Sequence, residues 1–145
     1  MYSDTVTLFN RVQSVGGDVF RATELEGVDF NADKGAIMSR YGAETDDNAI
    51  LHVRYENADG EALIGGKTYL EPKEFQRSPG GAITFTGGQS FDFFILGEWD
   101  GDDEIADDDY TAGFYDYCNK YYDHCYAITS AAKYSVIPHF EVTGR

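Results

Sequence analysis

Residues 49–56 have the sequence AILHVRYE, and their alternation sets the class of fold. Every second side chain is apolar: Ala49, Leu51, Val53 and Tyr55. Successive side chains of a strand point to opposite faces, so this pattern predicts a strand with one buried and one wet face. Such strands are typical of antiparallel sheets. The sequence NADG at residues 57–60 predicts a hairpin turn, in which Gly60 suits a positive φ.

Short segments rich in β-branched and aromatic residues recur on both sides of this hairpin. Gly27 interrupts one of them and predicts a bulge or a change of direction. Residues 91–96, FDFFIL, are the most apolar and are predicted to form the central buried strand. The last segment is predicted to be an edge or bulged strand, because Pro138 lacks an N–H. The predicted strands are residues 5–9, 19–30, 49–56, 63–64, 68–70, 83–85, 91–96, 126–129 and 134–143.

Two stretches have helical spacing instead. From residue 106 onward one helical face is aromatic and thiol-bearing, which predicts an amphipathic helix in the C-terminal third. The three aspartates at residues 107–109 stand where a helix N-terminus favours acids. A short helical loop is predicted near residue 37, within residues 31–48, which we expect to be a mobile, function-bearing loop. The residues on the predicted helical face are Tyr110, Phe114, Tyr117, Cys118, Tyr121 and Cys125.

These elements predict a mainly β chain with about eight short antiparallel strands, in a small β-barrel or sandwich. The length of 145 residues fits a single domain, residues 1–145. The N-terminus lacks a signal-peptide pattern, and no apolar run is long enough for a membrane span, so we expect no membrane association. The two cysteines, Cys118 and Cys125, are expected to be free core thiols, because seven residues of one helix would separate them by about 10 Å.

The net charge is -15, with 26 acidic against 11 basic residues. Such a surface repels nucleic-acid phosphates and anionic lipid heads, so binding to DNA or RNA by phosphate contacts is not expected. A passage through which DNA slides without being gripped remains compatible with this charge.

The acidic residues are densest between residues 98 and 109. An EF-hand calcium loop counted from Asp100 fails, because Ile105 stands at the glycine position and Thr111 at the bidentate glutamate position. Three interpretations stay open: a solvated loop before a helix, a calcium loop of another kind, and an electronegative working surface. The candidate working surface consists of Glu98, Asp100, Asp102, Asp103, Glu104, Asp107, Asp108 and Asp109.

No catalytic or metal-binding pattern stands out. The histidines His52, His124 and His139 are far apart in sequence, and no nucleophile motif frames them. Cys118, His124 and Cys125 lack a second pair at zinc spacing. We therefore expect no enzyme activity, no cofactor and no bound metal. Partner contacts are expected instead, and the candidate interface residues are Met38, Tyr41, Tyr115, Tyr122 and His139.

A family resemblance rests on the order of several short motifs. The chain opens with TVTLFN at residues 5–10 and continues with FRATELEGV at residues 20–28. It then has DNAILHV at residues 47–53, Tyr69 and Pro72, and ends with VIPHFEVTG at residues 136–144. In this order the chain resembles the minor capsid or head-closure ("stopper") proteins of tailed phages and prophages of Gram-positive bacteria.

This resemblance implies a small β-barrel subunit of the virion neck, made in the bacterial host cytoplasm. Such subunits form a ring, usually a hexamer, between the portal-bound adaptor and the tail or tail-terminator protein. They help retain packaged DNA, which passes without specific binding. The Asp-rich stretch at residues 100–124 departs from the family pattern, so adaptor and tail-terminator roles stay open. Two alternatives from other classes are a DNA-mimic inhibitor of a host nucleic-acid-binding protein and a calcium-dependent carbohydrate-binding module.

Overall fold

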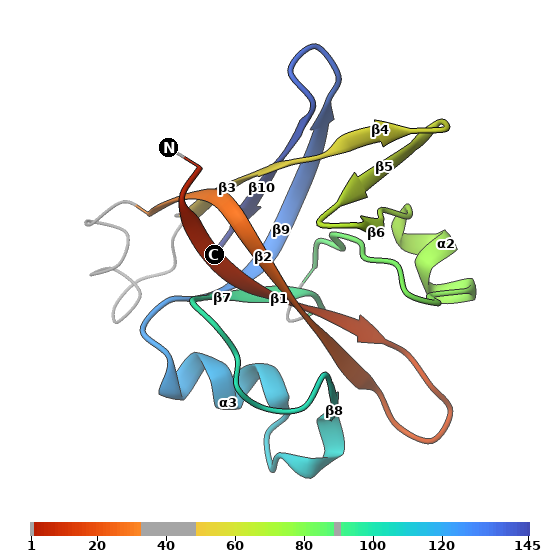
Figure 1. The fold of residues 1–145 in the computed structure, drawn as a ribbon. Coiled ribbons are helices and arrows are strands. Elements are labelled where there is room, and N and C mark those ends of the chain that lie inside the picture. The colour runs from red at the N-terminus through yellow and green to blue at the C-terminus, as the bar shows by residue number, and fades with distance from the viewer. Residues whose placement is uncertain (1, 33–48, 89–90) are drawn as a thin grey trace.

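Six antiparallel strands close into a barrel in the computed structural model, which describes residues 2–32, 49–88 and 91–145 (Figure 1). Around the barrel the order is β1-β7-β9-β10-β3-β2, and β2 pairs back onto β1. The mainly β prediction is therefore confirmed, and of its two architectures the barrel is the one observed. The strands are β1 (Asp4–Val12), β2 (Val19–Ala32), β3 (Ala49–Arg54), β7 (Phe93–Leu96), β9 (Cys125–Tyr134) and β10 (His139–Gly144).

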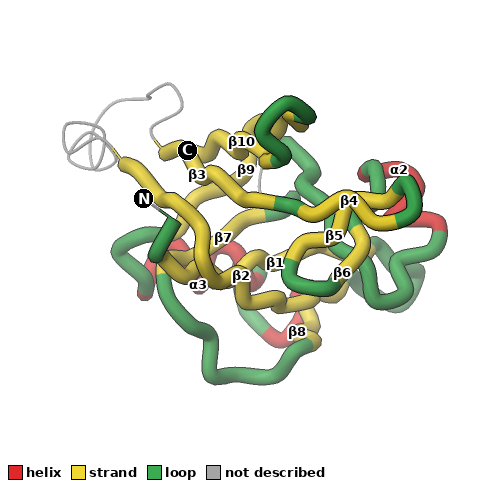
Figure 2. Tube along the Cα trace, turned by 45° about the horizontal axis from the view of Figure 1, so that its top comes forward, coloured by secondary structure: helices red, strands yellow, loops and turns green. Residues whose placement is uncertain are grey.

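Smaller elements cover the barrel. In Figures 1 and 2 a three-stranded sheet and α2 lie on one side of the barrel and α3 on the other. A further strand, β8, pairs with the first part of β2. No helix in the described part of the chain is long and apolar enough to cross a bilayer. These elements are β4 (Glu56–Ala58), β5 (Glu61–Ile64), β6 (Lys67–Thr68), α2 (Pro72–Arg77), β8 (Glu104–Ala106), a 3-10 turn η1 (Asp107–Asp109) and α3 (Phe114–Tyr121).

The alternation at residues 49–54 is confirmed in β3. Ala49, Leu51 and Val53 are buried, whereas the residues between them are exposed or half-buried. The following turn is confirmed as well, since Asp59 and Gly60 have φ angles of 53° and 83° between β4 and β5. Two consecutive positive φ angles match the twist of a two-residue hairpin.

The bulge predicted at Gly27 is also present. Asp4 pairs with Val28 and Thr5 with Glu26, so Gly27 is left without a partner across the strand pair, and its φ is 67°. An extra residue of this kind bends a strand. The bend lets one long strand, β2, pair with β1 and β8 along its first part and with β3 along its last.

The apolar residues form two separate cores because β1, β7 and the start of β9 are buried on both faces. One set of side chains, including Leu8, Phe94 and Tyr126, fills the barrel with Leu51 and Phe140. The alternate side chains point outward into a second core beneath α3 and β8. The prediction of a central buried strand at residues 91–96 is confirmed in β7, which lies between β1 and β9. The second core consists of Phe9, Phe20, Phe93, Ile95, Ile105, Phe114, Cys118 and Cys125.

The prediction of one strand over residues 134–143 is wrong. β9 continues to Tyr134, the chain turns at residues 135–138, and β10 begins at His139. Pro138 lies in this turn, where its missing N–H costs nothing, and β10 is an inner strand between β9 and β3. The apolar alternation continued through the turn and concealed it.

The prediction of one helix from residue 106 to residue 125 is also wrong. The segment contains η1 and the eight-residue α3, and Cys125 already belongs to β9. Gly113, whose φ is 97°, separates η1 from α3. Cys118 and Cys125 are fully buried free thiols, as expected of core residues, although the reasoning from a shared helix does not hold.

Two further segments differ from prediction. The strand expected at residues 68–70 ends at Thr68, and α2 follows with a proline at its first position and Phe75 buried. Residues 83–85 are buried but make only one bridge, between Ile83 and Tyr69, rather than a strand. The helical loop expected near residue 37 falls within residues 33–48 and lies outside the described residues.

Candidate functional site

The acidic segment, residues 98–109, was expected to be a surface loop leading into a helix. It contains regular structure instead, so this expectation is corrected. β8 lies inside it and pairs with β2. Two of its carboxylates have structural contacts. Glu104 lies 3.9 Å from Arg21, and Asp107 accepts a 2.8 Å hydrogen bond from the backbone N–H of Phe114, where α3 begins. Asp107 also lies 3.7 Å from Arg11, which binds Asp18 at 2.9 Å.

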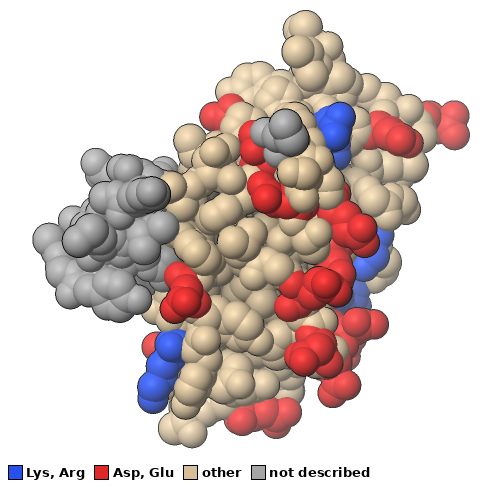
Figure 3. Space-filling model, turned by 60° about the vertical axis from the view of Figure 1, so that its left-hand side comes forward, with Lys and Arg blue, Asp and Glu red and all other residues tan. Residues whose placement is uncertain are grey.

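The other carboxylates of this segment are exposed to solvent. Among the described residues no basic side chain pairs with them. Figure 3 shows further acidic side chains spread from one end of a face to the other, so the charge is not confined to one segment. A broad negative field raises the local energy of approaching phosphates. The exposed carboxylates are Glu98, Asp100, Asp102, Asp103, Asp108 and Asp109.

Neutralising three of these carboxylates should not weaken the fold. In an Asp100→Asn, Asp102→Asn, Asp103→Asn variant we expect the free energy of unfolding to rise slightly or stay within about 0.5 kcal/mol, because exposed like charges are removed. Urea denaturation is the measurement. Asp107→Asn is the contrasting variant, with an expected loss of about 1 kcal/mol because it weakens the cap of α3. Equal losses of unfolding free energy in the two variants would contradict the conclusion that Asp107 has a structural role and the three exposed aspartates do not.

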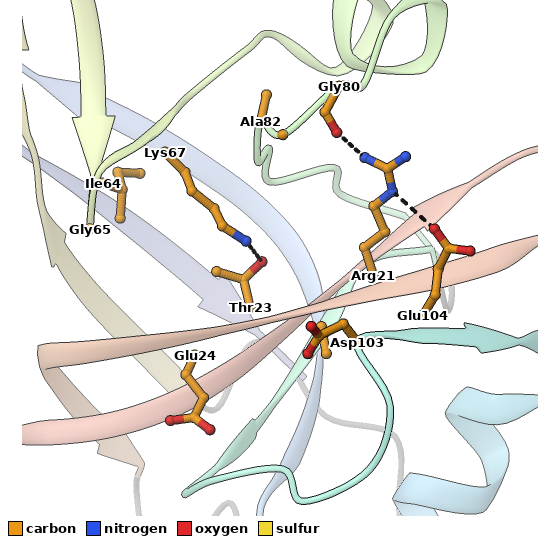
Figure 4. A pocket seen from close by; sticks show the side chains of 12 residues that line it. Arg21, Thr23, Glu24, Ile64, Gly65, Lys67, Gly80, Ala82, Asp103 and Glu104 are labelled. Atoms are coloured by element: carbon orange, nitrogen blue, oxygen red, sulfur yellow. Dashed lines mark hydrogen bonds and ion pairs between the residues drawn. The ribbon is translucent and has the colours of Figure 1, made fainter.

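An open groove of about 420 Å³ lies between β2, the end of β5 and the loop around residue 80 (Figure 4). Its two cations are Arg21 and Lys67. Arg21 donates a hydrogen bond to the Gly80 carbonyl, and Lys67 donates one of 3.1 Å to the Thr23 hydroxyl. These contacts tie β2 to neighbouring loops, so we assign the two cations a structural role.

The structure brings together two histidines that are far apart in sequence. His52 on β3 lies directly opposite Glu141 on β10, and His139 lies two residues before Glu141 on the same face. One nitrogen from each histidine and one Glu141 carboxylate oxygen all lie within 4.8 Å of one another. The His139 ring stacks between His52, at 5.7 Å, and Tyr134, at 4.9 Å between ring centroids. Sequence reasoning missed this group because the pairing of β3 with β10 was not known.

The β9–β10 hairpin projects from the barrel (Figure 1), and its tip carries exposed apolar side chains. Val136 is 96% exposed and Ile137 is 69% exposed. Tyr134, at the end of β9, is also exposed and accepts a 2.8 Å hydrogen bond from the Tyr55 hydroxyl at its backbone carbonyl. Exposed apolar side chains grouped on one projection are a feature of docking elements.

The candidate interface tyrosines lie elsewhere than expected. Tyr115 and Tyr122 are half-buried against the second core, where Tyr115 packs edge-on to Phe93 at 5.1 Å. Tyr117 and Tyr121, which were expected to face the core, are exposed instead. His139 is half-buried in its stack. Met38 and Tyr41 lie outside the described residues.

A buried carboxylate, Asp92, was also missed. Its two oxygens accept hydrogen bonds from the backbone N–H groups of Arg11 and Thr86, both at 2.8 Å, and from the Asn10 amide at 2.9 Å. The same Asn10 amide donates to the Thr84 carbonyl at 2.7 Å. Burial raises the pKa of Asp92 to about 6, although these hydrogen bonds oppose the shift. The contacts join β1, the loop at residues 84–86 and the start of β7, so Asp92 acts as a structural crosslink.

Together these features define a closed six-stranded antiparallel β-barrel protein with an acidic surface, a projecting apolar hairpin and a histidine–carboxylate group on its outer face. Over residues 1–145 the chain matches, and therefore belongs to, a family described as a family of unknown function (DUF6751). Comparisons with curated proteins and with solved structures found no match.

Proposed function

We propose that this protein is a ring-forming structural subunit of the phage head–tail connector, with a head-closure role. The observation that carries the proposal is the projecting β9–β10 hairpin, with Val136 and Ile137 at its tip. A rigid barrel with a protruding apolar element suits head-to-tail contacts, in which the element of one subunit docks on the next and the ring closes. The occupant of the docking site would thus be a second copy of this chain.

The sequence resemblance and the charge support the same proposal. A β-barrel is the fold that the resemblance to stopper proteins implies. A ring through which DNA passes must not hold it, and exposed carboxylates repel phosphates. On this proposal the neutralised aspartate variant keeps its fold but alters DNA retention or passage. Adaptor and tail-terminator roles would use the same contacts in another layer of the neck.

The hairpin tip provides the direct test. In a Val136→Asp, Ile137→Asp variant, two charges replace apolar contacts, and we expect ring formation to be lost while the monomer stays folded. The β1–β2 hairpin supplies a matched control, Val15→Asp, because Val15 is also fully exposed at a hairpin turn. Native mass spectrometry and electron microscopy of the protein co-expressed with its gene neighbours would measure assembly.

Three results would separate the outcomes. Rings in the wild type and the Val15 variant, but not in the double variant, support the proposal. Rings in all three proteins would show that the hairpin is not the contact. A wild type that stays monomeric with its gene neighbours at every concentration would contradict the ring proposal.

A DNA-mimic inhibitor is the second candidate, and the spread of carboxylates over one face in Figure 3 favours it. A mimic presents negative charge along a surface that a nucleic-acid-binding protein accepts in place of DNA. Gel filtration with purified host nucleases and repressors would detect a salt-sensitive complex. Such a complex, weakened by the aspartate substitutions and unaffected by the hairpin substitutions, would support the mimic over the ring.

A further inference from the structure

We propose that His52, His139 and Glu141 bind one divalent transition-metal ion, with Zn²⁺ as the probe. The inference goes beyond the proposed function and does not depend on it. It rests on the position of three donors on two neighbouring strands of the barrel wall. Two imidazoles and one carboxylate are a donor set that Zn²⁺ takes in open sites, with water in the fourth position.

The backbone already holds the donors in register. β3 and β10 are antiparallel neighbours, and His52 is the direct partner of Glu141. Donors around one Zn²⁺ ion lie about 3.3 Å apart, given metal–nitrogen distances of about 2.0–2.1 Å. The three donor atoms lie within 4.8 Å of one another, so small side-chain rotations would close the site. No strand has to move.

A hydrogen bond at one ring nitrogen of His139 leaves the other nitrogen available for a metal. The Nδ1 atom lies 2.6 Å from the Ile137 carbonyl oxygen. A carbonyl oxygen only accepts hydrogen bonds, so Nδ1 donates its proton and Nε2 keeps its lone pair. Metal-binding histidines usually donate their second nitrogen to a carbonyl or a carboxylate in this way. The contact therefore selects the tautomer whose Nε2 is free to bind a metal.

The chemistry of the donors selects the class of ion. Imidazole favours Zn²⁺, Ni²⁺ and Cu²⁺, whereas Ca²⁺ and Mg²⁺ prefer oxygen ligands. The neighbouring charges are mixed, because Asp29 lies opposite His52 on β2 and Arg54 lies opposite His139 on β3. A bound ion would join β3 to β10 next to the hairpin turn at residues 135–138 and would stabilise the hairpin.

Calorimetric titration with Zn²⁺, at physiological ionic strength and with excess Ca²⁺ present, tests the proposal. We expect one ion per chain, a rise of several degrees in Tm, and affinity at least tenfold weaker in His52→Ala, His139→Ala and Glu141→Gln. His124→Gln and Glu61→Gln are the matched controls, since neither residue belongs to the group, and both should bind as the wild type does. Visible absorption of bound Co²⁺ should report nitrogen ligation and disappear in the histidine variants.

The results separate the site from two other arrangements. Binding that Ca²⁺ displaces, or that both histidine variants retain, would place the ion on the acidic surface and overturn the proposal. If the wild type binds Zn²⁺ no more tightly than the histidine variants do, then His52, His139 and Tyr134 form only an aromatic stack. Circular dichroism of each variant would show that lost binding is not lost folding.

Discussion

Replacing Asp92 with Asn is expected to lower the free energy of unfolding by about 3 kcal/mol at neutral pH. The Asn amide group would take the place of one of two oxygens that accept hydrogen bonds from Arg11, Thr86 and Asn10. Buried N–H groups would then face another donor, and each unpaired donor costs about 1–3 kcal/mol. Urea denaturation followed by circular dichroism measures the loss.

The pH dependence of the free energy of unfolding, compared between the wild type and Asp92→Asn, tests the role of Asp92 further. Asp92 has a pKa of about 6 in the fold, against an ordinary value of 3.8. The folded state thus binds more protons than the unfolded state between these values. The associated stability, about 3 kcal/mol at most, is fully present below pH 3.8 and is lost as the pH rises through about 6.

The difference between the wild type and Asp92→Asn isolates this contribution, because both proteins share all other carboxylates. We expect the difference in stability to be larger near pH 5 than at pH 7.5. Asp103→Asn, which changes an exposed carboxylate, should follow the wild type at both pH values. Parallel pH profiles for the wild type and Asp92→Asn would contradict the raised pKa of Asp92.

Replacing Phe114 with Ala is expected to cost about 4 kcal/mol, the second large effect. Phe114 is fully buried and attaches α3 to the barrel wall. Its ring centroid lies 5.0 Å from Phe9 and 5.4 Å from Trp99. Trp99 is the only tryptophan in the chain, so its fluorescence should report the loosened packing directly.

An exposed residue of the same helix provides the control. Tyr121 is 63% exposed, and Tyr121→Ala should change stability by no more than about 0.5 kcal/mol. Chemical denaturation followed by both fluorescence and circular dichroism compares the two variants. Equal losses would show that α3 is not held against the barrel through Phe114.

Local patterns predicted the parts of the fold that local interactions determine. The alternation in residues 49–54, the turn at Asp59 and Gly60, and the bulge at Gly27 all follow from residue type and spacing. Residue type and spacing did not predict the C-terminal hairpin, because its apolar alternation runs through the turn at residues 135–138. Which residues turn there depends on pairing with β3, which is distant in sequence.

The candidate sites depended even more on distant pairing. The histidine–carboxylate group exists because β10 lies beside β3, and neither segment reveals its partner. Asp92 did leave a signal, since it is a lone acid in the most apolar segment of the chain. Its partners on β1 and in the loop at residues 84–86 could not be inferred. The acidic surface was visible from composition, but β8 and the role of Asp107 were not.

The position of β10 has a consequence for synthesis of the chain. This strand, His139–Gly144, follows all the others in the chain, yet it is inserted between β9 and β3. While these residues remain inside the ribosome, the emerged strands have a gap with two unpaired edges. The barrel therefore closes only after β10 has left the ribosome, and its closure depends on slow, long-range pairing. Until then the open edges of β3 and β9 are templates for aggregation, which a chaperone would limit.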